Sequence, residues 1–527
     1  MQVTKSMFEQ QKPQLLENLR RSIFVAFDLE FSGLQKPKNG GRHVAERPRS
    51  KMTLQECYAS TREAVEAYQL LQVGLCPVEW REVDKTYVAS PANIYINPIV
   101  SPNLGVDRVF SLQSSTLAFL IDHGFDFNTQ LRHGIAYLSR EEERKIIDSW
   151  CEEDRNREVL TIDSGSQQFA DDCIKALEEW ENDPDAPWDF INITTDRNIM
   201  SNYQRYIVHQ IVRTRFPKLI SQGRETFVCV TRQTEEQKSR KKAEAKDVFD
   251  EQLHTAIGLR HIIDELFEPK RPDGRKTVLV GHNCFMDLLH LYNCFIGKLP
   301  EKVEEFAELM SKSFPILIDT KFLATYGDDS TTANSGSTLS ILDSLLRPQT
   351  NPKIELHAEA NTYGGDNHAF HEAGYDAYIT ATILIRVAAR LVHESGWQLT
   401  PPQLQTHQTE PPSHRTTNVA RDVASEAKDY VPMEVDSEMP GIKDHGVGLA
   451  ETMGMVGVVS QQPQPNQRPV SFLSLGVSED EKFRDDVKTI PGFYDGDNSK
   501  FWEPYVNKLR MFNTDEGVLK LPRTRDV

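Results

Sequence analysis

The sequence predicts an α/β protein, because apolar runs typical of strands alternate with helical segments along most of the chain. Three observations support this prediction. FVAFDLEFSGL at 24–34 has the pattern of a buried strand, KTVLVGHN at 276–283 leads from a strand into a helix, and FPILIDTKFLAT at 314–325 repeats that passage. With 527 residues, the chain is long enough for two or three domains and at least one sizeable core.

The elements between the first strand and the later ones extend the same pattern. A helical segment near 54–71 precedes two strand-like runs, at 73–80 and 86–100, which suggest a sheet that grows in order from the N-terminus. Charged helical segments follow at 139–156 and 168–182. Helices and strands of this spacing favour one α/β domain interrupted by further segments.

The remaining stretches mark loops and boundaries. A basic loop, with seven basic or histidine side chains and one acid, follows the first strand at 36–51. A compact unit spans about 188–231, and a long amphipathic helix with a solvated first half is predicted over 235–267. From about residue 398 the composition shifts to Pro, Gln, Thr, Ser and acids, which indicates a disordered linker, and KFWEPYVNKLRMF at 500–512 reads as a last ordered fragment.

Composition restricts the class of protein. The 60 Lys and Arg against 78 Asp and Glu give a net charge of −18, so any contact with nucleic acid must come from local basic patches. The seven cysteines form no C-x-x-C pair, which fits a reducing compartment and indicates neither a disulfide framework nor a zinc ribbon. We expect no signal peptide and no membrane span, because the N-terminus is polar and no apolar run is long enough.

Two acids interrupt the first strand. Asp28 and Glu30 stand two residues apart, so both carboxylates project from the same face of a mostly apolar element. Like charges held so close are costly to bury unless a cation compensates, so the pair indicates a metal site or strongly raised pKa values. The alternative is a strand whose polar face is simply solvated.

Two other places complete a possible set of acids. Asp287 stands in the first turns of a helix that follows a strand, where it could equally be a surface acid that supports the helix dipole. Asp376 begins a helix whose apolar spacing predicts burial, so its carboxylate needs a partner. His371 precedes Asp376 by five residues and could also be an ordinary loop histidine. Together with Asp28 and Glu30 these residues form a more specific pattern than any one of them.

This constellation resembles the DEDD superfamily of 3′-to-5′ exonucleases, in the subtype with a histidine five residues before the fourth acid. More closely, the chain resembles the poly(A)-specific ribonuclease family of deadenylases over roughly residues 20–395. The resemblance rests on the phrases FDLEFSGL, QSSTLAFLIDHGFDFNTQLRHGIAYLSREEE, LVGHNCFMDLLH, LIDTKFLA and HEAGYDAYIT. It implies a ribonuclease-H-like mixed sheet flanked by helices, with the four acids converging at one end.

The chemistry of such a site explains its residue types. Four carboxylates suit hard divalent cations, so we expect Asp28, Glu30, Asp287 and Asp376 to bind two Mg²⁺ ions, for which Mn²⁺ could substitute. Two ions about 3.5 to 4 Å apart can clamp a phosphodiester, activate water and stabilise the leaving 3′ oxygen. His371 would accept the proton of that water, because an unperturbed imidazole titrates near working pH. The expected products are 5′-mononucleotides.

The resemblance also implies contacts with RNA. Phe31 and Leu34 would lie near the terminal bases. Lys321 would approach the nucleic acid, although a salt-bridging surface lysine is an equal alternative.

A second basic pattern lies inside the nuclease segment. Arg205 and His209 stand four residues apart on one helix face, which Arg213 continues. This R-x-x-x-H pattern resembles the small domain, named for that arginine and histidine, that binds single-stranded nucleic acid. An insert of this type would extend the track for the strand. A helix with an exposed basic face is the structural alternative.

With this resemblance the expected domain boundaries can be given. They are a first half of the nuclease at 1–165, the insertion with the R-x-x-x-H pattern at 166–235, the second half at 236–397, the linker at 398–470 and a C-terminal segment at 471–527 that packs partly on the core. KFWEPYVNKL is similar to the segment after the nuclease core in this family, but we expect no RNA-recognition-motif domain beyond it, so a preference for capped RNA is in doubt. The resemblance leaves a homodimer open and fits the nucleus, the cytoplasm or both.

The leading functional hypothesis is a Mg²⁺-dependent 3′-to-5′ exoribonuclease that shortens poly(A) and releases 5′-AMP. One alternative is a trimmer of the 3′ ends of small non-coding RNA, because adenine specificity cannot be read from residues that stack on any base. A non-catalytic RNA-binding adaptor is a different class, which the costly cluster of acids argues against. A proofreading DNA exonuclease is weaker still. The 2′-OH distinguishes RNA from DNA, and no residue of the sequence indicates how it would be read.

Overall fold

The computed structural model describes most of the chain. The described residues are 1–35, 51–153, 161–195, 200–232, 234–326, 337–364, 369–399, 487–512 and 514–523. The predicted basic loop, apart from Lys51, and nearly all of the predicted linker lie outside these ranges. Within them, none of the helices combines the length and the apolar character that a membrane crossing requires.

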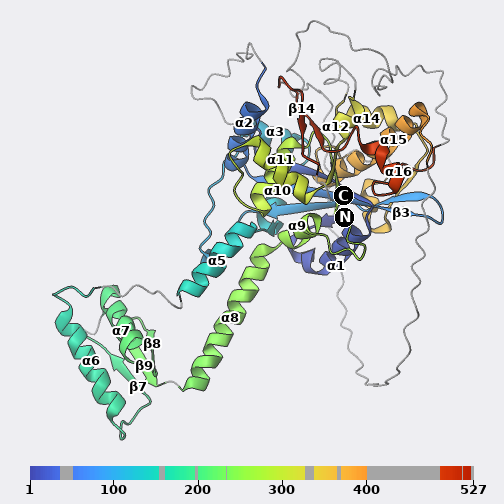
Figure 1. Cartoon of the computed structure of the whole chain (residues 1–527). Helices are drawn as coiled ribbons and strands as arrows, with labels where there is room; N and C mark the ends of the chain where they lie inside the picture. Colours follow the sequence, from blue (N-terminus) through green and yellow to red (C-terminus); the bar gives the residue numbers. More distant parts are fainter. Residues whose placement is uncertain are drawn as a thin grey trace, which may run out of the picture.

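A mixed sheet forms the centre of the molecule (Figure 1). Its middle strand is β2 (Phe24–Phe31), which runs antiparallel to β3 (Leu70–Arg81) and parallel to β10 (Val278–Gly281). Beyond β3 lies the antiparallel β5 (Ala92–Asn97), and beyond β10 lies the parallel β11 (Ile316–Asp319). This mixed sheet, flanked by helices on both faces, confirms the ribonuclease-H-like α/β fold expected from the sequence.

Further strands extend the sheet at its edges. They are β1 (Gln2–Val3), β4 (Thr86–Ala89), β6 (Ile135–Ala136), β12 (Lys353–Leu356), β13 (Lys508–Arg510) and β14 (Val518–Lys520). Strand β13 pairs with β11 and carries β14, so the C-terminal segment completes one side of the sheet. Trp502 anchors this segment, since its side chain is buried and its Nε1–H donates to the carbonyl of Pro491 at 2.9 Å.

Both faces of β2 are covered, which explains its nearly continuous apolar sequence. Phe27 and Leu29 belong to one core, and Phe24 and Ala26 belong to the core on the opposite face. The first core packs under α1 (Lys5–Arg21), α2 (Leu54–Ala67), α9 (Arg260–Phe267), α10 (Phe285–Phe295) and α11 (Val303–Ser313). The second packs under α14 (Leu339–Leu346), α15 (Ala373–Ser395) and the C-terminal segment with α16 (Gly496–Ser499) and η3 (Lys500–Trp502). Short elements complete the nuclease part: η1 (Pro102–Leu104), α3 (Ser114–Asp122), α4 (Phe127–His133), α12 (Thr320–Ala324) and η2 (Ala358–Tyr363).

A smaller unit stands away from the sheet on two helical arms, α5 (Arg140–Glu153) and α8 (Glu235–Ile257) (Figure 1). It contains α6 (Gln167–Asn182), α7 (Asn202–Arg215) and a three-stranded sheet in the order β7-β9-β8, with bounds Phe190–Ile193, Val228–Arg232 and Leu219–Gly223. The unit has its own hydrophobic core, separate from the two cores of the main sheet.

The long helix predicted over 235–267 is wrong in one respect, because the chain turns at Gly258 and forms α8 and α9 instead. Gly258 has φ +45°, and a Cβ at this position would lie 2.0 Å from the carbonyl oxygen of Ala136. Only glycine fits this close approach in the left-handed region.

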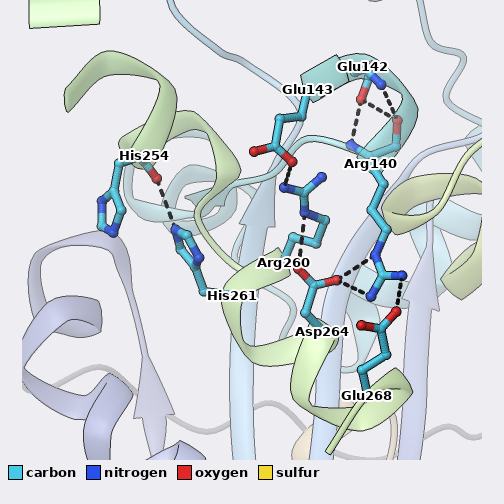
Figure 2. A network of polar contacts seen from close by, with 9 residues as sticks. Arg140, Glu142, Glu143, His254, Arg260, His261, Asp264 and Glu268 are labelled. Atoms are coloured by element: carbon cyan, nitrogen blue, oxygen red, sulfur yellow. Dashed lines mark hydrogen bonds and ion pairs between the residues drawn. The ribbon is translucent and has the colours of Figure 1, made fainter. Parts of the chain in front are cut away.

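Ion pairs join the first turn of α5 to α9 and to the residue that follows α9 (Figure 2). Arg140 of α5 contacts Asp264 at 2.8 Å and Glu268 at 2.6 Å, the latter directly after α9. Arg260, buried on α9, pairs with Glu143 of α5. The stacked rings of Trp150 and Phe249, 4.2 Å apart, join the arms further out.

Candidate active site

The carboxylates of β2 face the start of α15. Asp28 pairs with Gly74 of β3 across the sheet, and a Cβ on Gly74 would lie 1.8 Å from the carbonyl oxygen of Ala373. The missing side chain therefore lets the first turn of α15 lie directly on the sheet. This close approach brings Asp376, in that first turn, to the face on which Asp28 and Glu30 project.

Asp376 and His371 are joined through the loop before α15. The backbone N–H of His371 donates to Asp376 Oδ2 at 3.0 Å, and His371 has φ +68°, which is uncommon for a residue with a side chain. Ligand atoms of Glu30, His371 and Asp376 all lie within 4.8 Å of one another. The structure therefore brings the predicted base and two of the predicted acids into one cluster.

Asp287 reaches the cluster from the opposite direction, in the first turn of α10. The turn that leads into this helix is tight, since a Cβ on Gly281 would lie 2.3 Å from Cβ of Cys284 and Asn283 has φ +56°. Asp319 Oδ1 holds this turn by accepting the backbone N–H of Asn283 at 2.8 Å. Asp287 is buried, and its charge acts on Asp28, so it belongs to the same site.

Burial raises the pKa of all four carboxyl groups, and repulsion from other acids of the site adds to the shift at Asp28 and Glu30. Burial, followed by the charges of Asp376 and Asp287, holds the pKa of Asp28 and of Glu30 well above the usual value. Burial raises the pKa of Asp287 to about 7, although a hydrogen bond from the backbone N–H of Leu29 opposes the shift. Burial likewise raises the pKa of Asp376 to about 7.

These residues fit a hard divalent cation. The charges that raise the pKa of Asp28 are three other carboxylates, so the cluster needs positive charge to become fully ionised. Asp376 Oδ1 is buried and has no hydrogen-bond partner among the described residues. Carboxylate oxygens are the ligands that Mg²⁺ and Mn²⁺ prefer, and Asp28, Glu30, Asp287 and Asp376 are the residues that could hold them.

The residues predicted to contact RNA are placed differently from one another. Leu34 is 52% exposed beyond the end of β2, whereas Phe31 is buried and stacks on His290 with ring centroids 4.3 Å apart. Lys321 is buried, and its Nζ lies 4.9 Å from the ring centre of Phe512, so the alternative of a surface lysine is wrong. Contact of these residues with RNA stays a prediction.

The basic stripe of the insert lies on α7, and part of it is used inside the unit. Arg205 donates to the carbonyls of Met200 at 3.2 Å and Glu225 at 2.5 Å. His209 Nδ1 lies 2.7 Å from Ser221 Oγ on β8. Arg213 is exposed. The first two side chains therefore hold α7 against its own sheet, and Arg213 is the member of the stripe that faces solvent.

Sequence reasoning missed two residues beside the site. The rings of Phe119 and His123, at the end of α3, lie 4.6 and 4.4 Å from the ring of His371. Both belong to a phrase that carries the family resemblance, but no spacing or charge pattern connects them to His371, which stands far away in the chain.

A ribonuclease-H-like sheet with four converging carboxylates and an adjacent histidine defines the class of metal-dependent nucleases. The family model described as CAF1 family ribonuclease matches residues 3–384, and this chain belongs to that family.

Curated relatives agree with this assignment. Poly(A)-specific ribonuclease PARN of Xenopus laevis is 27% identical over 426 residues, which cover 76% of this chain and 64% of the relative. The uncharacterized protein C29A10.09c of Schizosaccharomyces pombe is 29% identical over 419 residues, which cover 73% of this chain and 93% of the relative. The human PARN protein is 27% identical and is also covered over 64% of its length, so this chain spans less than two thirds of the PARN proteins of Xenopus and human.

Among solved structures, the Mg²⁺- and Mn²⁺-bound form of S. pombe Pop2p is similar at 12% identity, with a TM-score of 0.34, over 73% of this chain and 89% of that chain.

Proposed function

We propose that this protein is a Mg²⁺-dependent 3′-to-5′ exoribonuclease that removes poly(A) from RNA and releases 5′-AMP. The observation that carries the proposal is the convergence of Asp28, Glu30, Asp287 and Asp376, with His371, on one end of the sheet. Membership of a ribonuclease family and 27% identity to proteins named poly(A)-specific ribonuclease support the choice of RNA and of adenine.

The residues of the site have distinct roles in this proposal. Asp28, Glu30, Asp287 and Asp376 would hold two Mg²⁺ ions, or Mn²⁺ in their place, and the ions would supply neutralisation of the phosphate charge and activation of water. His371 accepts the proton of the attacking water on a ring nitrogen, and its backbone bond to Asp376 keeps it beside the carboxylates. The metal ligands and the base come from β2, α10, α15 and the loop before α15, so no single element supplies the site.

The RNA strand would run from this site towards the insert. Leu34 offers an exposed apolar contact for a terminal base, and the buried Phe31 stacks on His290 at that end of β2. Arg213 offers an exposed cation on α7, where a longer strand gains affinity from phosphate contacts. Lys321 would reach the nucleic acid only if its side chain moves out from Phe512.

A trimmer of small non-coding RNA is the second candidate, since the described residues do not settle which base is read. An RNA-binding adaptor is disfavoured, because a buried cluster of like charges lowers stability, and a non-catalytic protein has no reason to retain such a cluster.

We also propose a homodimer, which sedimentation analysis would test. A location in the nucleus or cytoplasm is proposed as well, because free cysteines suit a reducing compartment.

The test is digestion of a panel of 5′-labelled RNAs with and without Mg²⁺. The proposal expects stepwise shortening from the 3′ end, faster on oligo(A) than on mixed 3′ ends, and none in EDTA. Equal rates on both kinds of end would favour the trimmer. Asp148→Asn, an exposed acid on α5, is the matched control for loss of one carboxylate and should cleave like wild type.

A further inference from the structure

Two rings at the end of α3 form a corner around the side chain of His371. The ring of His123 lies 4.4 Å from that of His371, and the ring of Phe119 lies 4.6 Å from it, with interplanar angles of 75° in both cases. Phe119 and His123 also contact each other, at 4.2 Å. His371 therefore presents its ring to two neighbours that meet it edge to face, a favoured aromatic geometry.

We propose that His123 is a positioning residue, whose ring holds the imidazole of His371 in the orientation that proton transfer requires. This inference rests on the proposed function, in which His371 is the base. In this role His123 acts through His371 and does not itself contact the substrate.

The first argument is that His123 is itself fixed. Its Nδ1 lies 2.8 Å from the carbonyl oxygen of Phe119, and the residue caps the C-terminal end of α3. Contact of the imidazole with a carbonyl in the last turn of the helix restricts the rotation of the ring. A ring held in this way can serve as a wall for another ring.

The second argument is that α3 is tied to the strand that carries the acids. The backbone N–H of Gln113, at the start of α3, donates to the carbonyl of Ser32 at 2.8 Å, and Gln113 Oε1 accepts the N–H of Leu34 at 2.9 Å. Ser32 and Leu34 directly follow β2. These hydrogen bonds therefore restrain the position of the His123 ring relative to Glu30, whose carboxylate lies close to His371.

The third argument is that other restraints on the ring of His371 are few. Its backbone N–H is bound to Asp376, but within the ranges that the structure describes no hydrogen bond fixes its ring nitrogens. The backbone is in the left-handed region, where a side chain gains no support from regular structure. Packing against His123 and Phe119 is thus what sets the direction of the imidazole.

The proposal makes a specific kinetic prediction, because a misplaced base lowers the rate of the chemical step. His123→Ala removes the wall, and kcat on oligo(A) should fall about ten- to a hundredfold while KM stays within about twofold. His123→Phe keeps a ring of similar size and should remain within about threefold of wild type. In a His371→Ala background, His123→Ala should have no further effect, because it acts through His371.

A second measurement is independent of cleavage. The Hε1–Cε1 resonance of His371, assigned by its loss in His371→Ala, should shift or broaden in His123→Ala and return in His123→Phe. Equal loss of kcat in the Phe and Ala variants, a further loss in the His371→Ala background, or an unmoved resonance would each overturn the positioning role.

The two proposals fail separately. Wild-type protein that leaves every RNA intact, while the resonance still moves in His123→Ala, would sink the proposed function and leave the ring contact standing. Wild-type protein that cleaves RNA, together with an unchanged kcat in His123→Ala, would sink the positioning role of His123 and leave the proposed function standing.

Discussion

The backbone N–H of Arg510 donates to Asp319 Oδ2 at 2.9 Å, so the C-terminal segment shares a carboxylate with the turn that precedes α10. Asp319 Oδ1 accepts the N–H of Asn283 in that turn and the N–H of Lys321 at the start of α12. The segment after residue 487 is therefore connected to the element that presents Asp287.

Cleavage of the chain within 400–486 should leave an active complex of two fragments. Strand β13 pairs with β11, and Trp502 is buried, so the contacts that hold the C-terminal segment do not depend on an intact linker. Size-exclusion chromatography after insertion of a protease site should show one peak with wild-type exonuclease rate. Trp502→Ala is the matched test of the contact and should destabilise the protein by about 3 to 5 kcal/mol. Separation of the fragments without loss of activity would contradict this view.

Asp28→Asn should abolish cleavage without destabilising the metal-free protein. One metal ligand is lost, and one of the repelling charges at the site is removed. The folded pKa of Asp287 and of Asp376, about 7, lies above their unfolded value. Stability from the protonated forms is therefore complete below about pH 4 and is lost as pH rises through about 7.

In EDTA, thermal melts of wild type should thus show a lower Tm at pH 8 than at pH 6, and Asp28→Asn should reduce the difference. Added Mg²⁺ should raise the Tm of wild type more than that of the variant. An Asp28→Asn protein that cleaves RNA would remove the carboxylates from the mechanism.

His371→Ala should separate chemistry from binding. Affinity for RNA and the rise of Tm with Mg²⁺ should stay near wild type, while the single-turnover rate falls by roughly 10² to 10⁴, the usual contribution of a positioned base. A rapid-quench assay with saturating enzyme measures this rate. A variant that cleaves at nearly the wild-type rate would leave His371 without a catalytic role.

Arg213→Ala and Arg205→Ala should have different effects, although both residues lie on α7. Arg213 is exposed, so its loss should weaken binding of long RNA, leave a trinucleotide unaffected and lower the slope of log K against log salt by about one. Arg205 holds two backbone carbonyls, so its loss should instead lower the thermal stability of the insert. Lys175→Ala, on the exposed side of α6, is the control. An unchanged salt slope for Arg213→Ala would exclude a phosphate contact.

Acid should destabilise the protein partly through His290. Burial lowers the pKa of this imidazole to about 3, and both ring nitrogens lack hydrogen-bond partners among the described residues. Because the folded pKa lies below the unfolded value of about 6.5, the stability that neutral His290 provides is present above pH 6.5 and falls as pH drops towards 3.

Urea unfolding at pH 5 and 7.5 tests this expectation. His290→Phe keeps the stack on Phe31 and should reduce the loss of unfolding free energy by up to about 1.4 kcal/mol for each pH unit below 6.5. The same dependence in His290→Phe as in wild type would contradict the assignment.

Local patterns were sufficient for the strands and for the set of acids. The apolar run around Asp28 predicts a strand, and its i, i+2 spacing places both carboxylates on one side, but only the cores on both faces decide against a solvated polar face. The break at Gly258 was not predictable, since a glycine within a helical pattern is tolerated unless another backbone, here that of Ala136, approaches it.

Contacts between distant segments explain what the sequence could not show. The i, i+4 pattern of Arg205 and His209 identifies a shared face, but not the carbonyls and the Ser221 hydroxyl that lie opposite. In the same way, the contact of His123 with His371 depends on how α3 is tied to the end of β2, which no local periodicity reports.

The order of the strands has a consequence for synthesis on the ribosome. Strand β2 emerges early with Asp28 and Glu30, but the loop and helix that supply His371 and Asp376 are translated only after the insert and both arms, and β13 later still. A nascent chain shorter than about 370 residues therefore lacks the fourth acid and the base, whatever it has already folded. A protein built in this order cannot assemble the proposed site before the residues around Asp376 have left the ribosome.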